Sequence, residues 1–286
     1  MRGLRQFSFI LFIISLALFL IFVIYSKIHA DITGPKLTVD EDVLEVSVKD
    51  DEKALLKGVK AMDAQDGDVS DSLVVENLSN FTTKGHRIIT YAAFDSNQNV
   101  GKISREIQYT DYESPVFKMT EAPEYSQSEL NKMEDFSGII QAEDCLDGDL
   151  SRMITMSTLR DYEETQFGGK QELEFKVSNS AGDVVSIPVT VSFHEVGAPV
   201  VRLSSYIAYV KKGARFDPNG YLKGATAGNE EYNMTEFREK YTDQTLTIKN
   251  GVNTAESGNY QVSYTVTTGS GNQIRGSTVY LQVVVQ

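Results

Sequence analysis

The chain has 286 residues and a net charge of −13, with 41% hydrophobic and 23% charged residues. This mixture is ordinary for globular protein and differs from that of a disordered chain. Residues 1–30 contain three basic side chains and no acidic one, so the remainder carries 24 basic and 40 acidic side chains. Nucleic-acid binding requires a basic surface, and the acidic composition of residues 31–286 does not provide one. We therefore expect no nucleic-acid partner.

An uncharged apolar segment, Phe7–Tyr25, follows a short N-terminus that contains Arg2 and Arg5. Its residues would form about 28 Å of helix, close to the hydrocarbon thickness of a bilayer. Positive charge before the segment predicts that residues 1–6 are cytoplasmic and that the rest lies outside the cell membrane, as in a single-pass type II anchor. A cleaved signal peptide is the alternative, because residues 28–30 resemble a cleavage site.

A sequence repeat follows this segment and is most easily seen by aligning three aromatic residues, Tyr91, Phe175 and Tyr264. Each lies six residues after a glycine, at the centre of an alternating apolar triplet, and is followed by a polar turn. The alternation predicts that the three aromatic side chains point into a core. Intervals of 84 and 89 residues indicate small domains rather than the units of a solenoid.

Three prolines, Pro35, Pro115 and Pro199, mark the start of the repeats. Each precedes a β-rich stretch, and proline at the start of a strand costs no ladder hydrogen bond. We expect three domains, each with a core of its own, over residues 31–113, 114–196 and 197–286, the third being divergent.

Period-two alternation predicts that the domains are built from antiparallel strands with one face on a core and one in water. Val185–Phe193 and Val279–Val285 show it most clearly, and each should pair with the aromatic-centred strand before it. Short helices are expected only at 128–136 and 234–241.

Cys145 is the single cysteine, so no disulfide can form within the chain. The domains must therefore be stabilised by their cores alone, which suits the surface of a Gram-positive bacterium.

Two acidic loops carry the most concentrated charge in the chain. The pattern A-x-D-x-x-D-G-D occurs at residues 61–68 and again at 142–149, whereas the third repeat has only a degenerate loop at 224–229. The repeats also share a glycine–aromatic strand and, after it, a polar turn, at residues 95–99, 179–183 and 268–272.

With these motifs the chain resembles the bacterial immunoglobulin-like (Ig-like) surface repeats, which occur in tandem in Gram-positive surface proteins and in a segment of some pesticidal crystal toxins. The resemblance extends over nearly all of residues 35–286. It implies three tandem Ig-like β-sandwiches behind one transmembrane helix, an all-β fold. It implies little about activity, because such modules are mostly spacers or binding surfaces.

The acidic loops have two interpretations. In the first, the aspartates stabilise turns by accepting hydrogen bonds from backbone N–H groups. In the second, neighbouring carboxylates bind Ca²⁺ weakly through their oxygen atoms. The candidate metal ligands are Asp63, Asp66, Asp68, Asp144, Asp147 and Asp149. Ca²⁺ is the only cofactor that the sequence suggests. The spacing of the aspartates in the two loops does not match that of an EF-hand.

Catalysis has little support in the sequence. The histidines, His29, His86 and His194, are isolated from one another, and Cys145 lies among aspartates that should raise the pKa of its thiol. No nucleophile–base pair occurs at a recognisable spacing, so we expect that this protein is not an enzyme.

Two functions remain. The first is a non-enzymatic, membrane-anchored surface protein whose Ig-like modules form a stalk or docking surface for an envelope or extracellular partner. The alternative is a carbohydrate-binding or envelope-polysaccharide accessory protein, with its binding face in the third domain. The partner, an envelope protein or a glycan, is not identified by the sequence.

Overall fold

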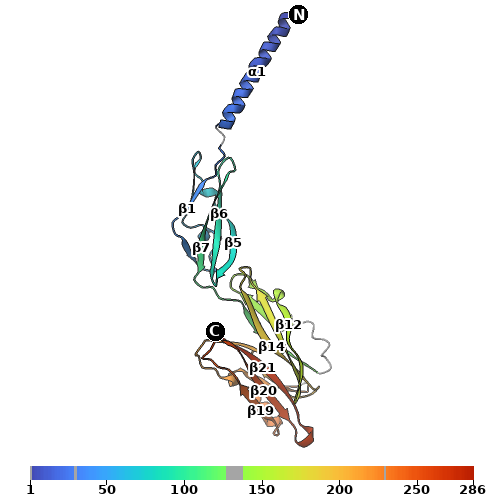
Figure 1. Ribbon diagram of the computed structural model, residues 1–286. Coiled ribbons are helices and arrows are strands. Elements are labelled where there is room, and N and C mark those ends of the chain that lie inside the picture. Colours follow the sequence, from blue (N-terminus) through green and yellow to red (C-terminus); the bar gives the residue numbers. More distant parts are fainter. Residues whose placement is uncertain (1, 29–30, 127–137, 229) are drawn as a thin grey trace. The chain divides into compact units, whose positions relative to one another are not determined.

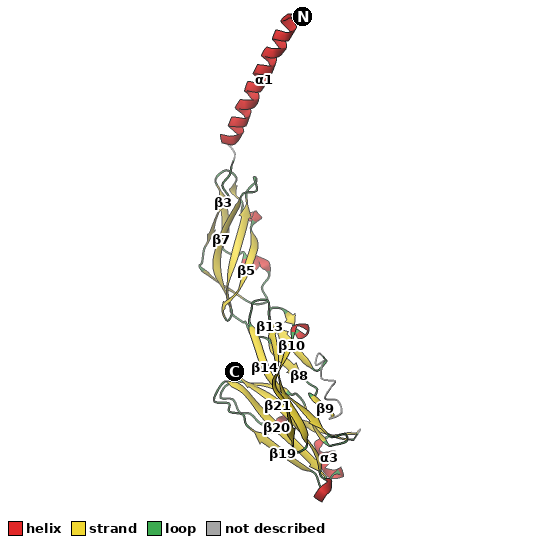
Figure 2. Ribbon diagram, turned by 45° about the vertical axis from the view of Figure 1, so that its right-hand side comes forward, coloured by secondary structure: helices red, strands yellow, loops and turns green. Residues whose placement is uncertain are grey.

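The computed structural model consists of an N-terminal helix and three β-sandwiches in the residues that it describes, which are 2–28, 31–126, 138–228 and 230–286 (Figures 1 and 2). The chain divides into two compact units, Met1–Thr110 and Asp111–Gln286. The first unit holds the helix and one sandwich, and the second holds two sandwiches. The predicted all-β architecture of three Ig-like repeats is therefore confirmed.

The N-terminal helix α1 (Arg2–Ile28) contains the predicted apolar segment. Phe7–Tyr25 has 19 residues with a mean hydropathy of 3.1, and none of it is buried by the protein. Among the described residues this is the one helix long and apolar enough to cross a membrane. A signal sequence has the same properties, so anchor and signal peptide both stay open.

The first sandwich has a three-stranded and a four-stranded sheet. Its elements are β1 (Lys36–Val39), β2 (Val43–Val46), α2 (Glu52–Leu55), β3 (Val59–Asp63), β4 (Gly67–Asp68), β5 (Val74–Thr83), β6 (His86–Phe94) and β7 (Val100–Tyr109). The sheets have the orders β1-β3-β4 and β2-β7-β6-β5. β2 runs parallel to β7, whereas β6 runs antiparallel to both of its neighbours. Apolar side chains from both sheets meet in one core.

The second sandwich repeats this arrangement. Its strands are β8 (Val116–Met119), β9 (Glu124–Ser126), β10 (Ile140–Asp144), β11 (Gly148–Asp149), β12 (Thr155–Thr165), β13 (Gly168–Ser178) and β14 (Val184–His194). The sheets have the orders β11-β10-β8 and β12-β13-β14-β9, and β9 runs parallel to β14. The short helix expected at 128–136 lies outside the described residues.

The third sandwich adds a helix to the same plan. Its elements are β15 (Val200–Leu203), β16 (Ile207–Val210), β17 (Leu222–Ala227), β18 (Glu230–Tyr232), α3 (Met234–Lys240), β19 (Thr245–Asn250), β20 (Gly258–Thr268) and β21 (Arg275–Val285). The sheets have the orders β15-β17-β18 and β16-β21-β20-β19. Helix α3 confirms the helix expected at 234–241, whereas the single turn of α2, capped by Asp51, was not predicted. It begins at a capping box in which Asn233 accepts the N–H of Glu236, and the Glu236 side chain accepts the N–H of Asn233.

The three repeated aromatic residues occupy equivalent positions in these sandwiches. Tyr91, Phe175 and Tyr264 are each at most 1% exposed, which confirms the predicted core positions. Each lies on the strand that pairs antiparallel with the next strand along the chain, as expected: β6 with β7, β13 with β14 and β20 with β21.

The second and third sandwiches share one continuous core, so the expectation of a separate core in each domain does not hold for this pair. The Phe117 N–H donates to the Tyr209 hydroxyl at 2.8 Å, and the Tyr206 N–H donates to the Met119 carbonyl at 2.8 Å.

The outer face of β14, predicted to lie in water, is also partly covered. Thr190 is 4% exposed and accepts a hydrogen bond from Gln261.

Candidate functional site

The first acidic loop connects β3 to β4, and hydrogen bonds to its own backbone hold it in place. Asp63 Oδ1 accepts the N–H groups of Gln65 (2.7 Å) and Asp66 (3.0 Å). Asp68 Oδ1 accepts the N–H of Ser70 at 3.0 Å. Backbone N–H groups lower the pKa of Asp63, and the side chain and backbone of Ser70 lower that of Asp68. Both carboxylates therefore stabilise turns, as the structural interpretation of the loop predicted.

The middle aspartate of each loop joins the loop to the turn after the aromatic strand. Asp66 Oδ2 accepts the N–H of Ser96 at 2.7 Å, and Asp66 Oδ1 accepts its hydroxyl at 3.0 Å. In the second sandwich, Asp147 accepts the N–H of Ser180 at 2.5 Å and its hydroxyl at 2.7 Å. The repeated aspartate thus joins two loops at one end of the first sandwich and at one end of the second.

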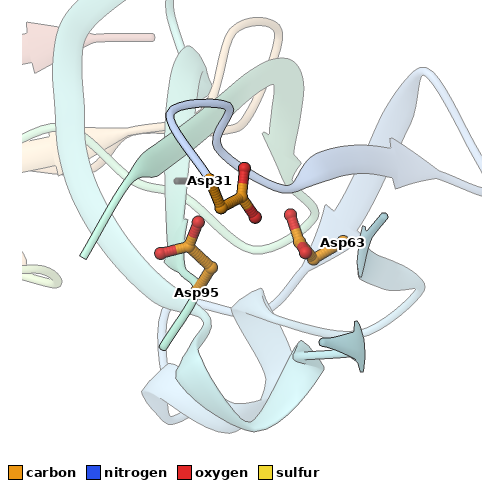
Figure 3. A group of neighbouring side chains, drawn as sticks. All are labelled: Asp31, Asp63 and Asp95. Carbon is orange, nitrogen blue, oxygen red and sulfur yellow. The ribbon is translucent and has the colours of Figure 1, made fainter. Parts of the chain in front are cut away.

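Three carboxylates gather at this end of the first sandwich, although not the three that the motif groups together. Asp31, before β1, lies beside Asp63 at the end of β3 and Asp95 after β6 (Figure 3). One oxygen from each carboxylate lies within 4.8 Å of the other two. Asp63 and Asp95 are only 8% and 7% exposed, and Asp31 is partly buried.

Hydrogen bonds fix the two members of this group that the motif does not include. Asp31 Oδ1 accepts the N–H and the hydroxyl of Thr33, at 3.1 and 2.9 Å. Asp95 accepts the N–H and the side-chain amide of Asn99, both at 2.7 Å. The same Asn99 amide donates to the Asp31 carbonyl at 3.1 Å. The segment at Asp31 is thereby tied to the turn after β6.

The second sandwich has an amide where the first has Asp95. The Asn179 side-chain nitrogen donates to Asp144 Oδ1 at 3.1 Å and to the Tyr112 hydroxyl at 2.8 Å. Asn179 Oδ1 accepts the N–H groups of Ala181 and Asp183, as Asp95 Oδ1 accepts that of Asn99. Asp144 and Asn179 are 8% and 6% exposed. The corresponding end of this sandwich is therefore joined by direct hydrogen bonds.

The structure thus distributes the predicted metal ligands differently from the motif. Asp63 belongs to the group of three carboxylates, whereas Asp66 accepts hydrogen bonds from Ser96 and Asp68 accepts one from Ser70. Calcium binding by the two loops stays a prediction. Asp31 and Asp95 were missed because neither lies in the acidic motif. Aligning the repeats identifies their positions: Asp31 lies four residues before Pro35, and Asp95 four residues after Tyr91.

A groove of about 400 Å³ lies within the second compact unit. It is lined by hydroxyl side chains of β19, β20 and β21, among them Thr247, Thr265 and Thr267. Tyr280 and Phe167 add aromatic rings to this lining. Hydroxyl groups beside aromatic rings can bind a polar ligand that has apolar faces.

The remaining reactive side chains have local partners. His86 Nδ1 lies 2.7 Å from Glu106 Oε1, and His194 Nε2 lies 3.8 Å from Glu124 Oε2, while His29 lies outside the described residues. The Cys145 thiol donates to a backbone carbonyl at 3.1 Å. Its pKa is raised, as predicted, although partial burial contributes more than Asp144 does.

Comparisons with known proteins do not place the chain in a family. No family model matches it, and no curated protein does. Among solved structures, the CBM51-2 and INT domains of Clostridium perfringens ZmpB, in complex with GlcNAc, match 50% of this chain and 30% of theirs, at 15% identity and a TM-score of 0.22. Protocadherin Gamma B7 cadherin domains 1–4 match 90% of this chain and 77% of theirs, at 12% identity and a TM-score of 0.22. Drosophila N-cadherin EC1-4 matches 72% and 59%, at 14% identity and a TM-score of 0.21.

This chain spans between about 30% and 50% of the length of the first structures that it matches. At TM-scores near 0.2 these likenesses give no argument about ligand or partner. The similarity to bacterial Ig-like surface repeats therefore rests on the motifs of the sequence.

Proposed function

We propose that this protein is a non-enzymatic surface protein, anchored in the cell membrane by α1, whose β-sandwiches form a docking surface for an envelope or extracellular partner. One observation supports the proposal above all: an apolar helix that the protein does not bury, long enough to cross a membrane, precedes the β-sandwich repeats. Arg2 and Arg5 precede the apolar segment and favour a cytoplasmic N-terminus. The acidic sandwiches then face the aqueous exterior, where their charge keeps them solvated.

The single cysteine tests this topology. Cys145 is exposed and lies in the second sandwich. A membrane-impermeant maleimide should therefore label the full-length protein in intact protoplasts. A matched control carries Gly3→Cys and Cys145→Ser, and it should be labelled only after the membrane is permeabilised. Labelling in the reverse order contradicts the proposal. Release into the medium of a chain that begins at Asp31 identifies a cleaved signal peptide instead.

Carbohydrate binding is the second candidate, and the hydroxyl-lined groove is the observation that favours it. Full-length protein in detergent should then bind members of a glycan array. Thr247→Val, an isosteric change in the groove, should reduce that binding at least tenfold, because it removes a hydrogen-bonding hydroxyl at about constant volume. Thr90→Val in the first sandwich is the matched control. Equal binding by both variants would argue against the groove.

A further inference from the structure

Asp31, Asp63 and Asp95 form a concentration of negative charge at the end of the first sandwich. Three segments that are far apart in the sequence supply them (Figure 3). The ion pairs that the structure shows for carboxylates of this sandwich involve Asp40, Glu76 and Glu106 instead. Among the described residues, no basic side chain neutralises the group. Gathering carboxylates away from water is unfavourable unless something compensates their charge.

One oxygen of this group also has no partner. Asp31 Oδ2 is buried and accepts no hydrogen bond from any residue that the structure describes, whereas Oδ1 of the same carboxylate accepts two. A buried acceptor without a donor is costly, and native structures rarely keep one unless a ligand or water satisfies it. The unsatisfied atom is part of the residue that completes the group of three.

The second sandwich shows what this position needs when a third carboxylate is absent. Asn179 stands four residues after Phe175, as Asp95 stands four residues after Tyr91. The Asn179 amide donates directly to Asp144, the counterpart of Asp63. A donor from the protein therefore satisfies the carboxylate there. In the first sandwich the ionised side chain of Asp95 has no donor, so the donor or positive charge must come from elsewhere.

We propose that Asp31, Asp63 and Asp95 bind one divalent cation, Ca²⁺, and that the second sandwich lacks this site because Asn179 replaces the third carboxylate. Ca²⁺ takes oxygen ligands at about 2.3–2.6 Å, so two ligands of one ion lie at most about 5 Å apart. One oxygen from each of the three carboxylates lies within 4.8 Å of the other two, which is inside that limit. Water would complete the coordination. The ion joins the segment at Asp31 to the ends of β3 and β6.

This site differs from the calcium site that the acidic motif suggests. Asp66 and Asp68 are not ligands, and the ion belongs to the first sandwich alone. The inference does not depend on the proposed surface function, because it concerns binding of the metal ion itself.

The test uses the full-length protein in detergent, freed of metal with EDTA and then dialysed. Titration with CaCl₂ in a calorimeter should give binding in the range of about 10⁻⁴–10⁻³ M that is usual for extracellular modules. Millimolar Ca²⁺ should raise the melting temperature of the first unit, and that of the second unit should not move. Absence of both heat and shift at 10 mM CaCl₂ overturns the proposal.

Three Asp→Asn variants locate the site. Asp95→Asn copies the second sandwich and should weaken binding at least tenfold. In EDTA it should melt no lower than the unchanged protein. The amide oxygen can keep the bond from the Asn99 backbone N–H, and the amide NH2, in place of accepting the bond from the Asn99 side chain, can donate to Asp63 as Asn179 donates to Asp144. Asp31→Asn should also weaken binding while it keeps the bonds from Thr33. Asp68→Asn is the matched control and should bind as before.

A purely structural role for the three aspartates predicts the opposite pattern. Asp95→Asn would then melt lower in EDTA, and added Ca²⁺ would affect the variant and the unchanged protein equally. Either result overturns the proposal, as does loss of binding in Asp68→Asn with binding retained in Asp95→Asn.

Discussion

Tyr91 and Tyr264 use their hydroxyl groups to hold backbone carbonyls that are distant in the sequence. The Tyr91 hydroxyl donates to the Leu55 carbonyl and the Tyr264 hydroxyl to the Pro218 carbonyl, both at 2.7 Å. Burial raises the pKa of both tyrosines, so each stays a neutral donor at physiological pH. Phe175 fills the same position without this bond. The aromatic residue is thus required for packing in every repeat, and its hydroxyl contributes in two of them.

Replacing Tyr91 by Phe should destabilise the first unit by about 1–3 kcal/mol. The change keeps the ring but removes the hydroxyl that accepts a hydrogen bond from Arg105 Nε at 2.8 Å. Arg105 is 4% exposed, so its donor would be left buried without an acceptor. Urea unfolding of the full chain measures the effect. Tyr260→Phe, whose hydroxyl bond lies at the surface, should change stability by less than about 0.5 kcal/mol. Equal effects of the two changes would contradict this argument.

The strands that contain or follow the repeated aromatic residues were predictable because each carries its own signal. Period-two alternation identified Val185–Phe193 as a strand, and the turn after Phe175 gave its partner. The packing of the third sandwich against the outer face of β14 was not predictable. Thr190 is polar, and nothing local indicates that Gln261 of the third sandwich covers it. Local pattern determines the element, whereas contacts between distant elements depend on the whole fold.

The candidate site was only partly predictable for the same reason. Asp63 was identified from its motif. Asp31 and Asp95 have no motif, and they approach Asp63 only because β1 begins near the place where β3 and β6 end. The motif also suggested that Asp66 is a metal ligand, and the structure adds that its carboxylate accepts two hydrogen bonds from Ser96. Spacing along the chain could not reveal that bond between two loops.

The acidic loop of the second sandwich should show its stabilising role in its pH dependence. The side chain and backbone of Ser151 hold the pKa of Asp149 below its ordinary value. Because the folded-state pKa is the lower one, Asp149 stabilises the fold at neutral pH and loses this effect as pH falls below about 4. Asp149→Asn should therefore destabilise the second unit at pH 7, and the difference from the unchanged protein should shrink towards pH 3.

Urea unfolding midpoints at several pH values measure this difference. Asp161→Asn, at an exposed position on β12, is the matched control and should leave the midpoint unchanged at each pH. A difference for Asp149→Asn that stays constant between pH 7 and pH 3 would show that the Ser151 contact does not favour the ionised form.

At the scale of the whole molecule, three sequence repeats give two compact units. The first sandwich keeps a core of its own. The second and third share buried side chains and backbone hydrogen bonds, including the bond from the Tyr206 N–H to the Met119 carbonyl. Cooperative unfolding follows shared burial rather than sequence repetition, because a domain that loses its neighbour exposes apolar surface to water.

Phe175→Ala tests this division directly. Phe175 is 1% exposed, and its truncation should cost the second unit about 3–5 kcal/mol. Because the second and third sandwiches share a core, both should unfold in one transition at a lower temperature, while the transition of the first unit stays in place. Differential scanning calorimetry of the full chain in detergent measures the two transitions. A third sandwich that melts separately, at an unchanged temperature, would show that the shared core does not couple the two sandwiches.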